Sequence, residues 1–523
     1  MAKRIFLWLV PLNFLLAGFI AFRSHGYINL FWLALIYALI GWRDLRSNHN
    51  ILRNYPVIGH FRYFFESIRP EIQQYFVESN DSGRPFSREQ RSVVYQRAKN
   101  VMDTLAFGTQ HTLMAVGHQY ALHSLLPVHV DSKEGRVLIG NEQCSQLYDA
   151  SRLNISGMSF GALGHTAIEA LNWGAKMGGF YLNTGEGGLT PYHLKHGGDI
   201  VLQIGTGNFS FRNPDGTFSS EKFKEKSAEP AVKMIEIKLS QGAKPSHGGL
   251  LPGAKVNEEI ATIRGIEVGK DCFSPATHPS VNSPRELMMF ITQVRELSGG
   301  KPVGFKLCLG QQREWFSICK AMLAMNVYPD FITIDGAEGG TGAAPLEFSN
   351  RLGLPVNDGV SLVHNTLVGL NLRNKIKLIA SGKVITGFDM VCKFALGADV
   401  CNSARGMMFS IGCIQSMHCN TNACPTGIAT QDPGRIGAVQ PDNKRHRVKH
   451  YHENTVDSFL ELMGAMGVST ACDLTASHVL MRVEGGAKTL AHYYPQMEAG
   501  ALLKQRLPKL FADDWQSASA DSF

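Results

Sequence analysis

The chain has little of what marks nucleic-acid-binding, disulfide-rich or disordered proteins. Its formal net charge is only +7 over 523 residues, and no long basic run is interleaved with aromatic residues, so nucleic acid is not an expected partner. Seven of its ten cysteines are scattered without the density of a disulfide scaffold, which indicates a reducing compartment. The hydrophobic content of 44% is enough for a large core and argues against a disordered chain. The 53 glycines suit a large α/β protein with many tight loops.

The remaining three cysteines are close together in the sequence. Cys413, Cys419 and Cys424 lie within twelve residues, and Pro425 follows the last. Thiolates bind soft metal centres such as iron-sulfur clusters far better than they bind hard cations. Zinc is a weaker alternative, because structural zinc usually takes four ligands, and three unrelated buried thiols are another. The run predicts an iron-sulfur site and electron transfer.

Two apolar stretches stand near the N-terminus, Ile5 to Phe22 and Tyr27 to Trp42. The first has about the length that crosses a bilayer, and the second is short for a span. A signal peptide is the alternative for the first, but no small-residue cleavage site stands out and a second apolar stretch follows. The sequence predicts a membrane-anchoring helical hairpin.

The charges that flank this hairpin predict its orientation. The connecting turn holds only Arg23, whereas basic residues stand before and after the hairpin: Lys3, Arg4, Arg43, Arg46 and Arg53. By the positive-inside rule, both ends and the soluble body are expected on the cytoplasmic side.

From Arg152 onward, short apolar or β-branched runs end in Gly-rich loops and alternate with helical stretches. Seven such runs begin at Asn154, Ile200, Met234, Val303, Phe331, Ile376 and Asp399. This pattern predicts repeated β/α units with a parallel sheet. A dinucleotide-binding open sheet would begin with Gly-x-Gly-x-x-Gly, but Gly205-Thr-Gly207-Asn-Phe-Ser lacks the third glycine.

A (β/α)8 TIM barrel fits the last two units better. Such barrels place a phosphate site in the loops after strands seven and eight. Here those loops read Ala380-Ser-Gly382-Lys383 and Asn402-Ser-Ala404-Arg405-Gly406, which supply flexible backbone amides and two cations. We expect a phosphate cradle there.

Long motifs lie between about residues 150 and 435: Ile155-Ser-Gly-Met158-Ser159-Phe-Gly, Asn183-Thr-Gly-Glu186-Gly-Gly, Lys238-Leu-Ser-Gln241-Gly-Ala-Lys244-Pro, Leu251-Pro-Gly-Ala-Lys255-Val, Phe305-Lys306-Leu, Glu338-Gly-Gly-Thr341-Gly-Ala and the Cys413 segment through Gln431. Together these motifs resemble the FMN-binding synthase domain of glutamate synthases, most of all its stand-alone members with a membrane-like N-terminus.

The resemblance implies a TIM barrel that carries FMN and a three-iron cluster. It implies reductive amination of 2-oxoglutarate to glutamate, through 2-iminoglutarate reduced by hydride from the flavin. A cluster passes single electrons and a hydride needs two, so a flavin between them suits this chemistry.

By position in the family, the resemblance also implies roles for individual residues. Lys306 would contact the flavin or a substrate carboxylate, Glu186 would orient the substrate, and Gln241 and Lys244 would shape the substrate side. The flavin ring would lie against Met158, Ser159 and Gln203. Its phosphate would be bound by Ser381, Gly382, Lys383, Ala404 and Arg405, and the cluster by Cys413, Cys419 and Cys424. For Lys306 and Glu186, a structural ion pair and a loop cap are the alternatives.

Two segments depart from the large glutamate synthases. Asp335-Gly-Ala-Glu338 replaces a Ser-Gly-His-Asp sequence, and Pro275-Ala-Thr-His278-Pro279 replaces a segment rich in Pro and His. Because both lie near the expected substrate, another oxo acid stays open. Ala2 stands where a glutaminase would have its nucleophilic Cys, so ammonia is expected from solution or a separate subunit. Electrons are expected from a ferredoxin, a flavoprotein subunit or a membrane donor.

Four segments are predicted: an anchoring hairpin at 1–44, a linking helical or irregular subdomain at 45–150, the barrel with its iron-sulfur loop at 151–440, and a helical extension at 441–523. In the extension, Asn454 to Met466 has the apolar spacing of a packed helix. Two rival functions remain. One is a barrel resembling inosine monophosphate dehydrogenase, with Cys413 as nucleophile; the other is a membrane-anchored flavin relay without turnover.

Overall fold

The structure is a computed structural model that describes residues 2–23, 28–101, 103–494, 496–504, 507 and 509–523. The chain forms two compact units, Met1–Arg88 and Glu89–Phe523, and each is described by itself. The predicted boundaries at 44, 150 and 440 stay predictions.

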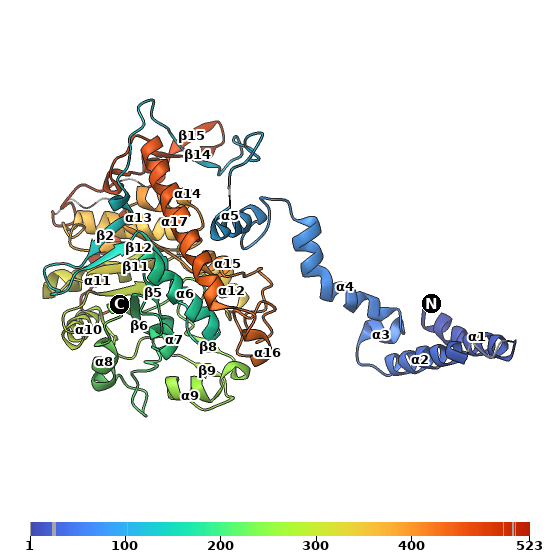
Figure 1. The fold of residues 1–523 in the computed structure, drawn as a ribbon. Helices are drawn as coiled ribbons and strands as arrows, with labels where there is room; N and C mark the ends of the chain where they lie inside the picture. The colour runs from blue at the N-terminus through green and yellow to red at the C-terminus, as the bar shows by residue number, and fades with distance from the viewer. Residues whose placement is uncertain (1, 24–27, 102, 495, 505–506, 508) are drawn as a thin grey trace. The chain divides into compact units, whose positions relative to one another are not determined.

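The larger unit is built on a closed barrel of eight parallel strands, which confirms the predicted TIM barrel (Figure 1). In chain order the strands are β4 (Leu153–Ile155), β5 (Leu182–Asn183), β6 (Ile200–Ile204), β7 (Val232–Lys238), β10 (Val303–Leu307), β11 (Phe331–Asp335), β12 (Lys377–Ser381) and β13 (Val400–Ser403). All seven predicted runs are barrel strands. The sequence missed only β5, because two residues are too short to show a pattern.

Helices lie outside the barrel strands (Figure 1). The longer ones are α6 (His165–Gly178), α8 (Ser220–Ser227), α10 (Pro284–Leu297), α11 (Gln312–Met325), α13 (Val356–Gly369) and α14 (Gly387–Ala395). Ser219, Ser283 and Thr386 cap the N-termini of α8, α10 and α14 by accepting a backbone N–H through the side chain. These caps fix where each helix begins, and so set the length of the loop before it.

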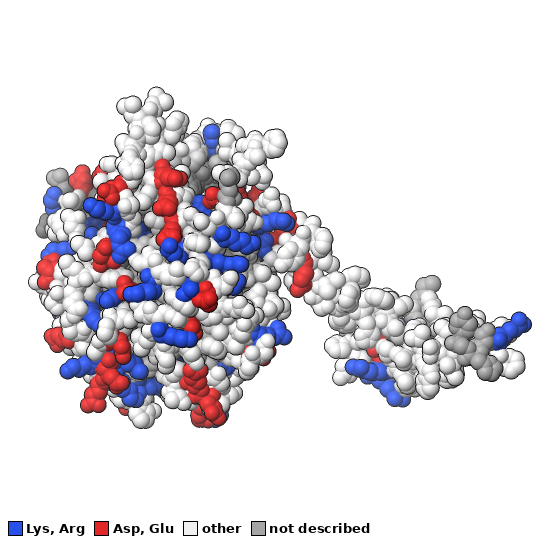
Figure 2. Space-filling view, in the orientation of Figure 1, with Lys and Arg blue, Asp and Glu red and all other residues white. Residues whose placement is uncertain are grey.

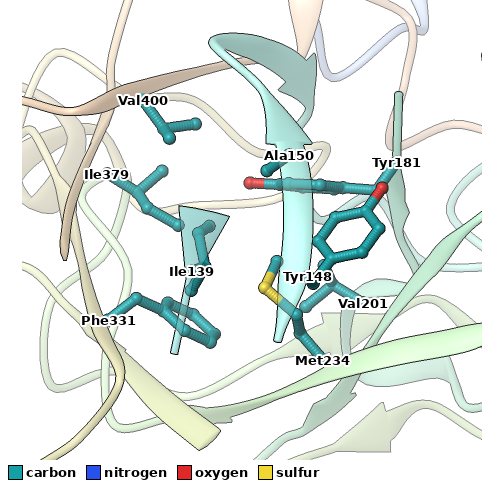
Figure 3. Packing of buried hydrophobic residues seen from close by; sticks show 9 residues of the cluster. All are labelled: Ile139, Tyr148, Ala150, Tyr181, Val201, Met234, Phe331, Ile379 and Val400. Atoms are coloured by element: carbon teal, nitrogen blue, oxygen red, sulfur yellow. The ribbon is translucent and has the colours of Figure 1, made fainter. Parts of the chain in front are cut away.

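A hairpin of β2 (Arg136–Ile139) and β3 (Tyr148–Ser151) closes the N-terminal end of the barrel. Its Ile139, Tyr148 and Ala150 pack among side chains from the beginnings of the barrel strands, as Figure 3 shows: Tyr181, Val201, Met234, Phe331, Ile379 and Val400. Because this end is filled with apolar side chains, any site in the barrel must lie at the opposite, C-terminal end.

The extension after the barrel is only partly helical. Helix α17 (Pro441–Ala465) packs against α6 and α14 and buries Val448, Tyr451 and Phe459, so the predicted packing role of its second half is confirmed. The structure then adds β14 (Val479–Val483) and β15 (Gly486–Thr489), which form an antiparallel sheet with β1 (Gln119–Ala121). These strands were not predicted, because the partner of β14 lies far away in the sequence.

Further elements of this unit are α5 (Arg88–Lys99), α7 (Pro191–Leu194), β8 (Leu250–Leu251), α9 (Glu258–Arg264), β9 (Cys272–Phe273), α12 (Leu346–Arg351), α15 (Arg405–Ser410), α16 (Pro433–Ile436), α18 (Leu490–Tyr493) and α19 (Lys509–Ser517).

The smaller unit begins with two apolar helices, α1 (Ala2–Arg23) and α2 (Ile28–Leu45), which pack against each other. Gly41 permits this, because a Cβ there would overlap the ring of Phe6. Both helices are long and apolar enough to cross a membrane, a test that buried helices and signal sequences also pass. The predicted turn between them falls largely outside the described residues. Then come α3 (Asn50–Asn54), α4 (Gly59–Ile72) and the π-helix η2 (Gln73–Val77).

Candidate active site

The residues predicted for the site all lie at the C-terminal end of the barrel. Gln203, Lys306 and Ser381 stand at or near the ends of β6, β10 and β12, Arg405 begins α15, and the others lie in the segments that follow β4, β5, β7, β12 and β13. Parallel strands place all these positions at one edge of the barrel. The predicted site residues therefore share one end of the barrel, although they are spread over more than 250 positions of the chain.

Glu186 lies in a cradle of glycines. Gly185 has φ +64°, and a Cβ there would stand 2.7 Å from the backbone N of Ser159. A Cβ at Gly205 would stand 2.6 Å from the Cβ of Glu186, and one at Gly249 would stand 2.5 Å from its Oε1. These close approaches explain the Gly-Glu-Gly motif: only glycine lets the loop fit against the first strand's loop while its carboxylate points inward.

Three cations surround this carboxylate. The Nζ of Lys238 lies 3.2 Å from Oε2 of Glu186, and the Oγ of Ser274 donates to the same oxygen at 3.3 Å. Burial alone would raise the pKa of Glu186, but Lys238, Arg264 and Lys244 outweigh it and the pKa is lowered. Glu186 is therefore ionised, and the group as a whole keeps an excess of positive charge.

Lys244 and Arg264 line a small cavity together with Glu186. Its lining also includes Ser159, Ser274 and Cys419, and it encloses about 50 Å³. Burial, with a smaller contribution from the charge of Lys238 and against the opposing charge of Glu186, lowers the pKa of Lys244 to about 8. The Nζ of Lys244 donates to the carbonyl of Ala343 at 2.8 Å.

Sequence reasoning missed Lys238, Arg264 and Ser274. Lys238 is the last residue of β7, and Lys306 is the last but one of β10, so the position of Lys238 was a usable signal. Arg264 is the last residue of α9, and Ser274 follows β9. Nothing local in the sequence relates either of them to Glu186, because only the fold brings α9 and β9 beside the barrel.

Lys306 is held at the mouth by carboxylates. Its Nζ lies 3.3 Å from Oδ2 of Asp335. Burial opposes its charge, but Asp335 and Glu236 outweigh burial and the pKa of Lys306 is raised. Below it, Glu236 accepts hydrogen bonds of 2.7, 2.7 and 2.6 Å from Asn183, Gln203 and Thr333. The Gln203 amide thus donates into the barrel, and Glu236 was another residue that sequence reasoning missed.

The loops after β12 and β13 have the features of an anion cradle. Ser381 Oγ lies 3.2 Å from Ser156 Oγ, next to the first strand's loop. Arg405 lies so close to Gly340 that a Cβ there would overlap its guanidinium, and Lys383 is exposed with φ +49°. Small residues and two cations fit a phosphate group, as these loops would need for FMN.

The three cysteines lie together after α15. Burial, with smaller contributions from the charges of Cys419 and Cys424, raises the pKa of Cys413 to about 12. A cysteine nucleophile needs a lowered pKa, so Cys413 lacks the character that the dehydrogenase alternative requires. Among the described residues, no three His, Cys, Asp or Glu side chains lie close enough together to hold one metal ion as they stand. Three thiols are nonetheless the kind of donor set that a soft metal centre takes, and the pKa of Cys424 is lowered by hydrogen bonds, first among them the one from Thr426.

Lys255 anchors the cysteine segment. It is 2% exposed, and its Nζ donates to the carbonyls of Ala162, Cys419 and Ala429 at 3.0, 2.8 and 2.8 Å. One side chain therefore joins the loop after β4 to both ends of the segment that carries the last two cysteines.

The two segments that differ from the large glutamate synthases contain Glu338 and His278, and both side chains have defined surroundings. The carboxylate of Glu338 accepts from the backbone N of Val356 at 3.0 Å, at the start of α13. His278 is buried, and burial lowers its pKa to about 4, so it is neutral. It lines a separate cavity of about 770 Å³ beside the ends of β7 and β10.

An eight-stranded barrel with an ionised, cation-ringed carboxylate at its mouth defines an enzyme-like (β/α)8 protein. The conserved region of glutamate synthase matches residues 92–469, and the chain therefore belongs to the glutamate synthase family, as the motifs indicated. It is a glutamate synthase-type oxidoreductase.

Relatives whose names include glutamate synthase match most of the chain. It is 38% identical over 485 residues to the "Glutamate synthase large subunit-like protein YerD" of Bacillus subtilis, covering 85% of this chain and 92% of that protein. It is 31% identical over 356 residues to the "Archaeal-type glutamate synthase [NADPH]" of Thermotoga maritima, covering 68% and 67%. With the "Archaeal glutamate synthase [NADPH]" of Methanocaldococcus jannaschii it shares 32% identity over 332 residues, 63% and 62% of the two chains.

Proposed function

We propose that this chain converts 2-oxoglutarate and ammonia into L-glutamate. The observation that carries the proposal is the group of Lys238, Lys244 and Arg264 around Glu186. A dicarboxylate needs two or more buried cations, and one of the three is already neutralised by Glu186. Because the cavity encloses only about 50 Å³, we expect the loop that carries Ala343 to open when substrate binds.

FMN would lie against Met158, Ser159, Gln203 and Lys306, with its phosphate at Ser381, Gly382, Lys383, Ala404 and Arg405. When bound, it supplies the hydride that reduces the imine carbon. Ammonia condenses with the keto carbon and releases water, which gives 2-iminoglutarate; hydride and a proton then give glutamate. We propose that Lys244 and Arg264 bind the carboxylates, that Gln241 shapes this side, and that Glu186 orients the nitrogen.

Cys413, Cys419 and Cys424 would hold an iron-sulfur cluster, expected to be of the three-iron type. Cys419 lines the same cavity as Glu186, so the proposed electron entry lies next to the proposed substrate site. A ferredoxin, a flavoprotein subunit or a membrane donor would deliver the electrons. Ammonia would come from solution or from a separate glutaminase subunit.

The deciding experiment uses the full chain, purified without oxygen. Absorption and electron paramagnetic resonance spectra should show flavin and an iron-sulfur cluster. The reduced flavin should then be reoxidised by 2-oxoglutarate with ammonium, and glutamate should form. Protein without iron and acid-labile sulfide would remove the cluster from the proposal, and reoxidation by a different oxo acid alone would replace the substrate. A flavin that no oxo acid reoxidises would favour the relay without turnover.

For location, we propose that α1 and α2 anchor the chain in a membrane and that the barrel faces the cytoplasm. In the view of Figure 2, few charged side chains appear over these helices, whereas charges of both signs are interspersed over the barrel. Added protease should digest the barrel in inside-out vesicles and spare it in right-side-out ones; the reverse pattern would contradict this orientation.

A further inference from the structure

Helix α4 carries an aromatic stripe that no other described residue of the smaller unit covers. Phe61, Phe64, Phe65, Ile68 and Ile72 follow the spacing of one helix face. Phe61 is 61% exposed, Phe64 55% and Phe65 57%. The stripe continues into η2, where Phe76 is 84% exposed. An amphipathic helix normally turns such a face to a core, so this stripe needs another apolar partner.

The start of α4 is fixed beside the end of α2. Asp44, in the last turn of α2, is 1% exposed. Its carboxylate accepts from the backbone N of Val57 at 2.8 Å and lies 2.9 Å from Nε2 of His60. This buried contact lies within the smaller unit and sets the level along α2 at which α4 begins.

The end of α2, where α4 begins, carries residue types that are typical of the surface of a membrane. Trp42 is 53% exposed, and the guanidinium of Arg46 lies 4.9 Å from its ring centre. Tryptophan and arginine gather where the acyl chains meet the headgroups. Between positions 43 and 72 the chain has five arginines against three carboxylates, and a positive balance favours anionic headgroups.

The polar side of α4 suits water and headgroups. Arg62 and Glu66 lie one turn apart there, 3.5 Å from each other. Tyr63 lies on this side of the helix too, well away from the stripe by helical spacing. A helix with one aromatic face and one charged face lies in the surface of a bilayer rather than across it.

We propose that α4 and η2 lie in the headgroup layer of a phospholipid bilayer beside the hairpin, with the aromatic stripe turned to the acyl chains. This rests on the proposed anchoring by α1 and α2. A second copy of the chain, or the barrel of the same chain, would be a different cover for the stripe.

The test uses the full chain in vesicles of phosphatidylcholine and phosphatidylglycerol that contain a photoactivatable lipid, with the reactive group near the acyl carbonyl. Mass spectrometry maps the lipid adducts. We expect adducts on Phe61, Phe64, Phe65 and Phe76 several-fold above those on Tyr63 and Ser67. Adducts on α1 and α2 without any on α4 would overturn this inference and leave the anchoring intact, whereas a chain without adducts would overturn both.

A variant tests whether the aromatic side chains of the stripe, rather than the helix as such, make the contact with lipid. Replacing Phe61, Phe64 and Phe65 together by Ser should lower the adducts on residues 72–77 several-fold and leave those on α1 unchanged. Tyr63→Ser, a matched loss of one aromatic ring on the polar side, should leave the adducts on residues 72–77 as they are. Equal effects of the two variants, or protein cross-links from α4 to a second copy or to the barrel instead of lipid adducts, would overturn the inference.

Discussion

Single charged side chains decide what the barrel mouth can bind. Lys238 forms the ion pair with Glu186, so its charge is already balanced. Arg264 donates to the carbonyl of Phe160 at 2.9 Å, and that neutral partner leaves its charge available. Lys244 donates to the carbonyl of Ala343, which is likewise neutral and leaves the charge of the lysine available. Two buried cations with unbalanced charge are what a dicarboxylate requires.

The titration of Lys244 should make the rate of the reaction depend on pH. Burial lowers its pKa to about 8, so it is charged below that pH and neutral above it. We expect kcat/KM for 2-oxoglutarate to fall as pH rises through about 8. Lys244→Arg should remove this fall, because arginine keeps its proton at these pH values.

Lys244→Met should lower kcat/KM at neutral pH by roughly 10- to 150-fold, which corresponds to the loss of a hydrogen bond to a charged group worth about 1.5–3 kcal/mol. Steady-state kinetics with varied 2-oxoglutarate measures it. Lys176→Met, on the exposed face of α6, is the matched control and should behave as the native chain. An unchanged kcat/KM in Lys244→Met would remove this residue from the substrate site.

Among the elements, the loop after β5 depends on a close approach of its backbone to the loop after β4. Gly185→Ala should destabilise the chain by more than the roughly 1–2 kcal/mol that a left-handed alanine costs, because its Cβ also meets the backbone of Ser159 at 2.7 Å. Gly197→Ala is the matched control: its φ of +66° is nearly the same, but no atom stands within 4 Å of the added Cβ. Urea unfolding compares the two, and equal losses would contradict the close approach.

The cysteine segment depends on Lys255 in a comparable way. Lys255→Met keeps the length of the side chain but removes the donors to Ala162, Cys419 and Ala429. Buried carbonyls left unpaired cost about 1–3 kcal/mol each. We expect faster hydrogen exchange in residues 413–430 relative to the barrel strands.

Lys301→Met provides the control for that experiment. Lys301 is also a buried lysine, and it donates to the carbonyls of Ser227 and Glu229 after α8. This variant should leave exchange in residues 413–430 unchanged relative to the barrel. If both variants affect that segment alike, Lys255 has no special part in holding it.

At the scale of the whole molecule, α17 is part of the barrel's support. Phe459 is fully buried and packs against Phe394 of α14, with ring centres 4.8 Å apart. Phe459→Ala should lower the free energy of unfolding by about 3–5 kcal/mol. Phe273→Ala, at a ring that is 65% exposed, should change it by less than about 0.5 kcal/mol.

Two probes should follow the Phe459→Ala unfolding, one in the barrel and one in α17. We expect coincident transitions, because α17 packs against both α6 and α14. An earlier separate transition of α17 would mean that the extension folds apart from the barrel.

Local pattern was enough for much of the fold. Seven barrel strands were predictable, because buried parallel strands are continuous apolar runs that end in Gly-rich turns. The strand β5 was not, since Leu182 and Asn183 are too few to form a pattern. Nor was the pairing of β14 with β1, because Gln119 and Met481 meet only after the chain folds.

The sequence alone determined the barrel, the two apolar helices and the residue types at the site. These follow from periodicity and from motifs that are contiguous in the chain. Only the tertiary structure decided that Lys238 and Arg264 converge on Glu186. The same holds for the hydrogen bonds that Glu236 accepts inside the barrel. It also holds for Lys255, which joins the cysteine segment to the loop after β4. Charge and hydrogen bonding act over a few ångströms in space, and distance in space is fixed by the closure of the barrel rather than by separation along the chain.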